Sequence, residues 1–203
     1  MYNALYQYTN DIDWFFLYGN VPVHVASNGG LLPNNIYRAV DLQSLQTAIE
    51  NMDDDCEFEL NMPALNYYVR RHYEGMNEFL PIKAYNVDFP EGTEAWVKAY
   101  AWSFARMAKR GFYSFDRSAD TGMYFLVCKP KKAPANVPDI VNDLIFRIEG
   151  DNDNILHNAN GELDNLGSQS FPLVKWINTY QNKQHPRERE GKGTGGQVHV
   201  PQQ

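Results

Sequence analysis

The chain has 203 residues, 43% of them hydrophobic and 21% charged, which is the usual balance for a globular protein. This length suits one domain with an appendage, or two small domains. The net charge is −7, and because residues 181–203 carry four basic and two acidic side chains, the first 180 residues hold −9. An acidic body argues against broad, sequence-independent nucleic-acid binding and leaves open only a local contact by the tail.

The N-terminal region predicts a β-hairpin. Residues 12–18 and 21–26 are two β-prone runs separated by Gly19-Asn20, a pair that is typical of a hairpin turn. Pro22 fits an edge strand or the first residues of a strand. The sequence Asn28-Gly29-Gly30 then ends the second run.

The middle of the chain predicts helices that alternate with short strands. Leu42, Leu45, Ile49 and Met52 recur at the spacing of an amphipathic helix over residues 41–52. The further predicted elements are a strand at 56–60, a helix at 61–73 capped by Asn61, a strand at 79–89, a helix at 93–110 capped by Thr93, and strands at 112–115 and 123–128.

A run rich in Pro and Lys, residues 129–135, is typical of a linker. Beyond it we expect a helix at 138–150, a polar loop at 151–167 and a short helix at 170–180. The predicted fold class is α+β, a mixed sheet with the N-terminal hairpin and packed helices, followed by a small C-terminal helical extension and an extended tail. The expected units are an α+β domain at 1–135, the helical extension at 136–180 and an arm at 181–203.

The chain shows no targeting signal or membrane segment. Its start has neither a basic stretch nor an apolar core of the secretory type, and no apolar run approaches the roughly 20 residues that span a bilayer. Cys56 and Cys128 form no CxxC pair, so we expect two free thiols. A cytoplasmic origin is the expectation.

We predict no cofactor and no metal site. The five histidines show no HxH, HxxxH or HExxH spacing, and the cysteines do not join them. The sequence Gly191-Lys192-Gly193-Thr194 fails as a phosphate loop, because Ser or Thr must follow the Lys directly. A calcium loop at 151–162 fails because Leu156 stands where a Gly is needed.

The hairpin offers one candidate chemical site. His24 on the second strand can meet Asp11 or Asp13 on the first, which is the arrangement of a general base and its orienting carboxylate, or of a structural hydrogen bond. Residues 27–30 can form a backbone nest that binds an anion, or a turn that needs positive φ. Both alternatives stay open.

Bases and aromatics alternate over residues 67–73, as they do in many nucleic-acid contacts. Helical geometry spreads them around the circumference, so core tyrosines with solvated arginines are the competing interpretation. No GxSxG or comparable nucleophile context is present. The sequence therefore predicts that the protein is not an enzyme.

The arm at 181–203 predicts a partner contact. It has no aromatic residue and two valines as its only aliphatic side chains, so alone it buries too little apolar surface to offset the entropy of ordering. An acidic surface on a neighbouring copy is the natural place for it. The residues expected to bind there are Arg187, Arg189, Lys192, Val198 and Val200.

Residues 10–16 (NDIDWFF) and 22–33 (PVHVASNGGLLP) resemble the start of uncharacterised small proteins from gut Bacteroidetes and their crAss-like bacteriophages. The resemblance covers about the first 35 residues and carries no catalytic motif. It implies a phage protein, and for this size a virion connector or tail ring component, assembled in the cytoplasm of the bacterial host.

The leading hypothesis is therefore a structural virion subunit that forms a symmetric ring and contacts other virion proteins, with its arm laid on neighbouring subunits. One alternative is a small-ligand-binding or hydrolytic protein centred on His24, Asp13 and the turn at 28–30. Another is a phage-encoded regulator that binds a host protein, which predicts a monomer or dimer instead of a ring.

Overall fold

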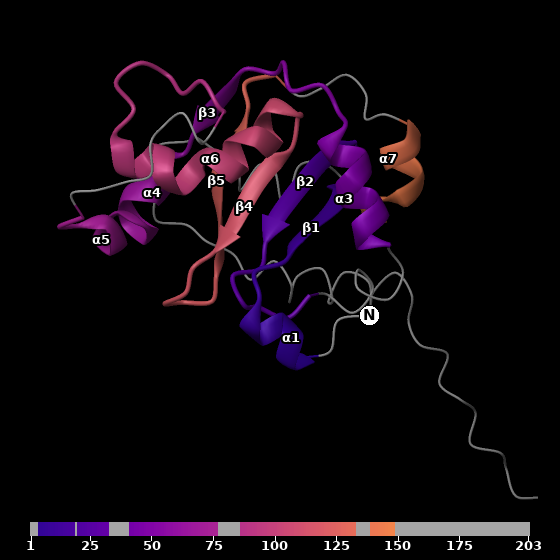
Figure 1. Cartoon of the computed structure of the whole chain (residues 1–203), viewed down its shortest axis with the longest axis horizontal. Helices are drawn as coiled ribbons and strands as arrows, with labels where there is room; N and C mark the ends of the chain where they lie inside the picture. Colours follow the sequence, from indigo (N-terminus) through magenta and orange to yellow (C-terminus); the bar gives the residue numbers. More distant parts are fainter. Residues whose placement is uncertain (1–3, 19, 33–40, 77–85, 133–138, 149–203) are drawn as a thin grey trace, which may run out of the picture.

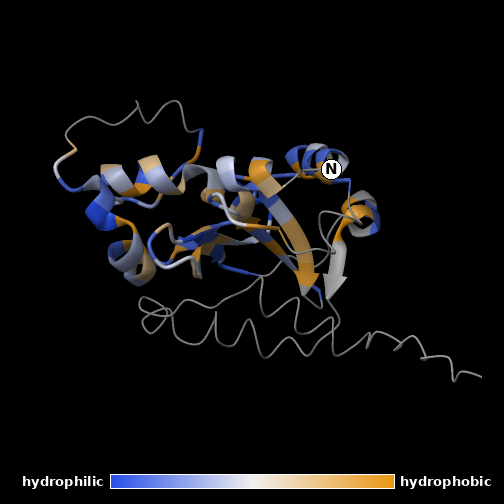
Figure 2. Cartoon of the chain, turned by 90° about the horizontal axis from the view of Figure 1, so that it is seen from below, coloured by the Kyte–Doolittle hydropathy of each residue, from blue (hydrophilic) through white to orange (hydrophobic). Residues whose placement is uncertain are grey.

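The computed structural model describes residues 4–18, 20–32, 41–76, 86–132 and 139–148. Within them, helices pack on a single mixed sheet (Figure 1). The predicted α+β class is confirmed. Hydrophobic residues dominate the layer of strands, whereas the helices carry both hydrophobic and hydrophilic residues along their turns (Figure 2).

The sheet contains six strands in the order β3-β5-β4-β2-β1-β6. The pairs β1–β2, β4–β5 and β3–β5 are antiparallel, whereas β2–β4 and β1–β6 are parallel. The two edge strands are the shortest, with three residues each. The bounds are β1 Asp13–Tyr18, β2 Val21–Ala26, β3 Phe58–Leu60, β4 Tyr113–Arg117, β5 Tyr124–Pro130 and β6 Phe146–Ile148.

The helices begin where the sequence supplies caps. Asp41 accepts a hydrogen bond from the Ser44 amide, and Asn61 accepts one from the Ala64 amide, so each satisfies a free donor of the first turn. The bounds are α1 Ala4–Thr9, α3 Leu42–Glu50, α4 Met62–Tyr68, α5 Arg70–Tyr73, α6 Ala95–Lys109 and α7 Asp139–Leu144.

One face of the sheet, here called the helix-covered face, packs against α3, α4, α6 and α7. Phe15 and Leu17 of β1 pack with side chains of α3 and α7, and Phe125 and Val127 of β5 pack with α4 and α6. Because successive side chains of a strand point to opposite faces, their neighbours point the other way. That opposite side, the aromatic face, carries Trp14, Phe16, Val23, Val25, Tyr113, Phe115, Tyr124 and Leu126.

Several predicted elements are confirmed and others change. The hairpin pairs as expected, and α3 and α6 fall within their predicted ranges. The helix expected at 61–73 divides at Val69 into α4 and α5, and α6 begins after Glu94, because the Thr93 hydroxyl donates to the Pro90 carbonyl instead of capping it. Residues 86–89, the described part of the strand expected at 79–89, form a loop.

The C-terminal end of the described chain differs most from expectation. A helix was predicted over 138–150, but α7 ends at Leu144 and residues 146–148 form β6 instead. This strand pairs with β1, and Val141 and Ile145 pack with α3 side chains in one cluster. Residues 139–148 thus belong to the sheet and its core. The rest of the predicted extension, and the arm, lie outside the described residues.

Candidate functional site

His24 meets the partner that the sequence predicted. Its Nε2 lies 3.2 Å from Oδ1 of Asp13, and its Nδ1 lies 2.7 Å from the Ser114 hydroxyl oxygen. The register explains this, because Ser114 on β4 is the direct neighbour of His24, and Asp13 stands two residues before its β1 neighbour Phe15. The Nε2 group makes no well-aligned hydrogen bond, but at this distance it interacts with the Asp13 carboxylate by both hydrogen bonding and charge.

A serine, a histidine and an aspartate in a row have the composition of a hydrolase triad, but the histidine and the serine are sealed, and only the Asp13 side chain, 42% exposed, reaches solvent. His24 is 1% exposed, Ser114 is 0% exposed, and the His24 ring lies between Phe15 and Phe104 at 5.2 and 5.9 Å. A nucleophile must reach its substrate. The row is therefore a structural contact inside the core, and the His24 centre of the predicted ligand site has no opening.

Asp13 shows the electrostatic effect of this contact. Burial would raise the pKa of the Asp13 carboxyl, but the hydrogen-bonding and charge interaction with His24 outweighs it and holds that pKa below its ordinary value. The two strands of the hairpin are thus joined by a side-chain interaction between Asp13 and His24.

The turn at 27–30 is explained by backbone geometry. Asn28 and Gly29 have φ values of 40° and 67°, and the Gly30 amide donates to the Ser27 carbonyl over 2.7 Å. Two consecutive positive φ values define a primed turn, which Asn and Gly adopt most easily. The Asn28 amide already donates to Asp11 Oδ1 over 2.6 Å, so the acceptor of this amide is a side chain of the protein itself and not a bound anion.

A cavity of about 240 Å³ opens beside this turn, between α4, α5, α6 and β4. Tyr68, Val69, Tyr73 and Phe125 form its apolar walls. Its polar groups come from several separate elements and are Asn28, His72, Tyr100, Asp116, Arg117 and Ser118. Convergent polar groups in an apolar hollow are the usual composition of a small-ligand site.

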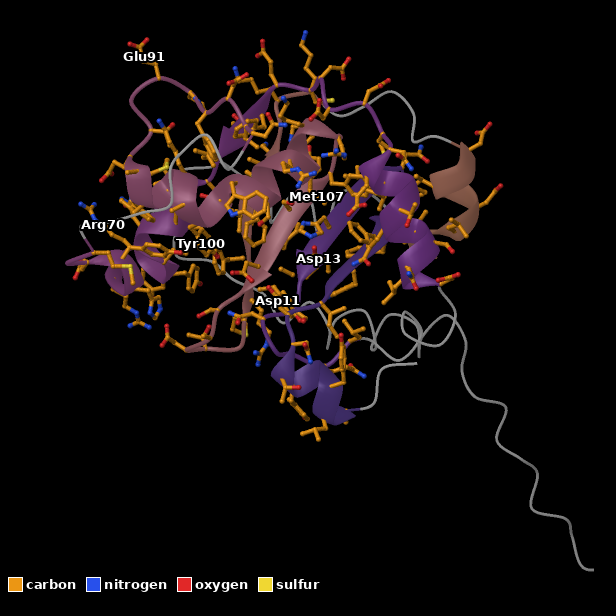
Figure 3. All side chains as sticks on the ribbon, viewed as in Figure 1. Asp11, Asp13, Arg70, Glu91, Tyr100 and Met107 are labelled. Carbon is orange, nitrogen blue, oxygen red and sulfur yellow. The ribbon has the colours of Figure 1, made fainter. Side chains whose placement is uncertain are left out.

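Asp116 is the distinctive group of the cavity. It is 7% exposed, accepts a short hydrogen bond from the Tyr100 hydroxyl, and accepts another from the Arg117 amide over 2.7 Å. Burial raises the pKa of Asp116 to about 7, since the two hydrogen bonds offset it only in part and the charges of Asp11 and Asp13 add to it. Tyr100 lies on α6, and Asp11 and Asp13 lie where the chain enters β1 (Figure 3).

Tyr100 responds to the same environment. Burial and the adjacent Asp116 charge raise the pKa of its hydroxyl well above the ordinary value, so the phenol keeps its proton. Asp116 is therefore a carboxyl that changes charge near neutral pH beside a fixed hydrogen-bond donor. Such a group can hold a proton or accept a hydrogen bond from a ligand amine or hydroxyl.

The rim of the cavity joins α5 to the loop after β4. Asp120 contacts the Arg71 guanidinium and lies 3.2 Å from His72 Nε2. The hydrogen bond from Arg71 lowers the pKa of Asp120, against a smaller effect of burial, and His72 adds to the lowering. All three side chains are exposed enough that solvent screens the pairing.

The alternation of bases and aromatics at 67–73 separates into two sets. Tyr68 is buried and stacks on Phe125 with ring centroids 4.5 Å apart, and Tyr73 lies against Trp96 and Tyr100. The basic side chains of α5 are exposed or on the rim. Core tyrosines with solvated bases are the interpretation that this geometry supports for Tyr68 and Tyr73, whereas Tyr67 is 62% exposed and is not a core residue.

Helix α1, which the sequence did not predict, has inverted polarity. Its buried residue is Gln7, whose side-chain oxygen accepts a hydrogen bond from the Leu32 amide over 2.7 Å. Its apolar residues face outward instead, with Leu5 72% exposed and Tyr8 60% exposed, and Leu31 of the adjacent loop is 42% exposed. An added Cβ on Gly29 would lie 2.9 Å from the Tyr8 carbonyl oxygen, which places this loop against α1. We call Leu5, Tyr8 and Leu31 the α1 patch.

The predicted arm residues Arg187, Arg189, Lys192, Val198 and Val200 lie outside the described residues, as does the 151–162 segment. Within the described ranges, no three His, Cys, Asp or Glu side chains come together as metal ligands. Cys56 and Cys128 are both free. No helix of the described part has the length and apolar character needed to cross a bilayer.

No protein-family model, no curated protein and no solved structure matches this chain.

Proposed function

We propose that this chain is a structural subunit that assembles with further copies of itself, as a connector or tail ring component of a phage virion. The α1 patch is the main observation that supports the proposed assembly. A helix normally turns its apolar side inward, and α1 does the reverse by burying Gln7 and exposing Leu5 and Tyr8. Exposed apolar patches mark sites of protein contact, and tyrosine is enriched at the centre of interfaces.

Charge supports a second copy as the partner. The first 180 residues hold −9 and the arm holds +2, so the arm of one copy is attracted to the body of the next. Arg187, Arg189 and Lys192 supply the charge, and Val198 and Val200 supply apolar contact. The phage context of the proposal rests on the resemblance of the first 35 residues.

The mass of the full chain in solution tests this proposal. We expect a concentration-dependent oligomer by light scattering and sedimentation. The double substitution Leu5→Glu with Tyr8→Glu removes the patch and adds two negative charges, and it should yield a monomer. The control Gln43→Glu with Asn66→Glu adds the same charge at exposed positions on α3 and α4, and its oligomer should persist.

A chain that ends at residue 180 should assemble more weakly and with less dependence on salt. A wild-type chain that stays monomeric or dimeric at high concentration would contradict the ring and would favour the regulator that binds a host protein. Unchanged assembly of the Leu5→Glu, Tyr8→Glu variant would contradict the role of the patch.

The Asp116 cavity favours a second function, binding of a small molecule. A buried carboxyl with a pKa near 7 and a fixed tyrosine donor face a 240 Å³ space, and such groups cluster at functional sites. The volume suits a small molecule with an amine or hydroxyl for Asp116 and a flat apolar part for Tyr68 and Phe125.

Nuclear magnetic resonance of the labelled full chain, titrated with small aromatic amines and alcohols, tests this binding. We expect shifts at the amides of Asp116, Arg117 and Ser118, and loss of binding in Asp116→Ala. The exposed control Asp139→Ala should bind as the wild type does. A compound set that shifts none of these amides would contradict the ligand site.

A further inference from the structure

The aromatic face of the sheet is buried, although no described helix packs on it. Its eight side chains, from Trp14 to Leu126, are at most 7% exposed. The clusters that contain α3, α4, α6 and α7 take their sheet side chains from the helix-covered face. Among the described elements, α6 contacts β3, β4 and β5, and α4 contacts β5; the other helix–strand contacts are weaker. The cover of the aromatic face therefore lies outside the described residues.

The course of the chain indicates which of the remaining segments can cover the aromatic face. Residues 77–85 join α5 to α6, and residues 133–138 lead from β5 to α7, so both return to helices of the covered side. Residues 33–40 likewise lead to α3. Residues 149–203, in contrast, follow β6, which pairs in parallel with β1 at the sheet edge. The pair Phe16–Phe146 places this edge directly beside the aromatic face.

The composition of residues 149–180 suits such a cover. This stretch holds Leu173, Trp176, Ile177 and Tyr180 at helical spacing. An 11-residue helix at 170–180 is about 16 Å long, at roughly 1.5 Å per residue. Four neighbouring strands at about 4.8 Å spacing span about 14 Å. A helix of this length is long enough to cross β5, β4, β2 and β1, the strands that carry the aromatic face.

Two buried polar atoms on the aromatic face have unused hydrogen-bonding capacity. Trp14 Nε1 and Tyr124 Oη are buried and interact with each other, but neither makes a well-aligned hydrogen bond. The two rings meet edge to face with centroids 6.4 Å apart, so both polar atoms lie in one place. Buried donors are nearly always satisfied, and the Asn, Asp and Ser residues of 149–180 supply acceptors.

We propose that residues 149–180 fold back over the aromatic face of the same chain and complete its core, with the helix at 170–180 as the central contact. The domain then extends to about residue 180, and only 181–203 remains as an arm. This inference does not depend on the proposed assembly, because it concerns contacts within one chain.

Photo-crosslinking of the full chain tests the placement. A benzoylphenylalanine at Trp176 should crosslink to peptides of β1, β2 and β4, whereas the same group at Lys175, on the other side of the predicted helix, should crosslink much less. Crosslinks confined to other surfaces would overturn the proposal. Crosslinks only between isotopically light and heavy chains would show that a second copy covers the face, and would overturn it as well.

Truncation gives an independent measurement. A chain that ends at residue 180 should still unfold cooperatively and should not bind a hydrophobic dye. In the full chain, Trp176→Ala should lower the thermal midpoint by several degrees, whereas Lys175→Ala should leave it unchanged. Equal midpoints for Trp176→Ala and the wild type would overturn the proposal even if a chain that ends at residue 148 failed to fold.

Discussion

Two polar clusters occupy the helix-covered face of the sheet, and they differ in what surrounds them. His24 and Ser114 are enclosed between Phe15 and Phe104, whereas Asp116, two residues after Ser114 on the same strand, faces a cavity. The first cluster has the residue types of a hydrolase but no access. The second has ordinary residue types and a buried, perturbed carboxyl in the wall of a cavity. Access and environment, more than residue type, decide which cluster can act on another molecule.

The largest expected difference between the two clusters is the pH dependence that Asp116 gives to the free energy of unfolding. Its pKa changes from 3.8 to about 7 on folding, so between these pH values the folded state binds more protons than the unfolded state. The free energy of unfolding should therefore fall as pH rises from 4 to 7, by up to about 4 kcal/mol. Asp116→Asn should abolish this fall in urea titrations across that range.

The exposed control Asp139→Asn should keep the wild-type slope. A wild-type pH profile that matches the profile of Asp116→Asn from pH 4 to 7 would show that folding does not raise the pKa of Asp116, and would remove it as the distinctive group of the cavity.

A substitution in the enclosed cluster should lower the free energy of unfolding and should not affect ligand binding. His24→Ala removes a ring that lies between Phe15 and Phe104 and leaves the Ser114 hydroxyl buried without its partner. We expect a loss of about 3 kcal/mol in the free energy of unfolding, measured by urea denaturation at pH 6. A stable His24→Ala protein that instead loses a ligand would show that the cluster is accessible.

Tyr100→Phe tests the link between α6 and the cavity. It removes the hydroxyl that donates to Asp116, and this hydrogen bond lowers the pKa of Asp116. We expect a loss of about 1–2 kcal/mol at pH 8, where Asp116 is ionised, and an extension of the pH-dependent fall to higher pH. An unchanged pH profile would mean that the two side chains do not interact in solution.

The smallest effect is expected at the rim. Asp120 is exposed, and its contacts with Arg71 and His72 are screened by solvent. Asp120→Asn should leave the urea midpoint unchanged within error at pH 7, both at low salt and at 0.5 M salt. A clear shift would mean that the rim holds α5 in place and that the cavity depends on it.

The sequence predicted the elements whose signals are local. The hairpin follows from two β-prone runs around Gly19-Asn20, and α3 follows from its apolar spacing and the Asp41 cap. The contact of His24 with Asp13 could also be predicted, since both lie on one hairpin. That His24 is sealed could not, because Phe104 comes from a helix 80 residues further along the chain.

The elements that were missed depend on distant partners. Helix α1 buries a glutamine, which no apolar pattern reveals, and its position depends on the Leu32 amide. Residues 146–148 form a strand because β1 offers a free edge, although their apolar pattern also continues a helix. Asp116 lies just beyond the strand predicted at 112–115, and its role requires Tyr100 from α6. A lone aspartate directly after Tyr113-Ser114-Phe115 is the one local signal that pointed to a polar group inside a strand.

The lengths of the two edge strands bear on how copies of this chain can meet. β3 and β6 each offer three residues of backbone, and Lys129 and Lys131 pair with glutamates beside β3. Short, charged edges resist continuation of a sheet from one molecule into the next. Copies of this protein should therefore join through side-chain surfaces and should not grow into fibrils by strand addition.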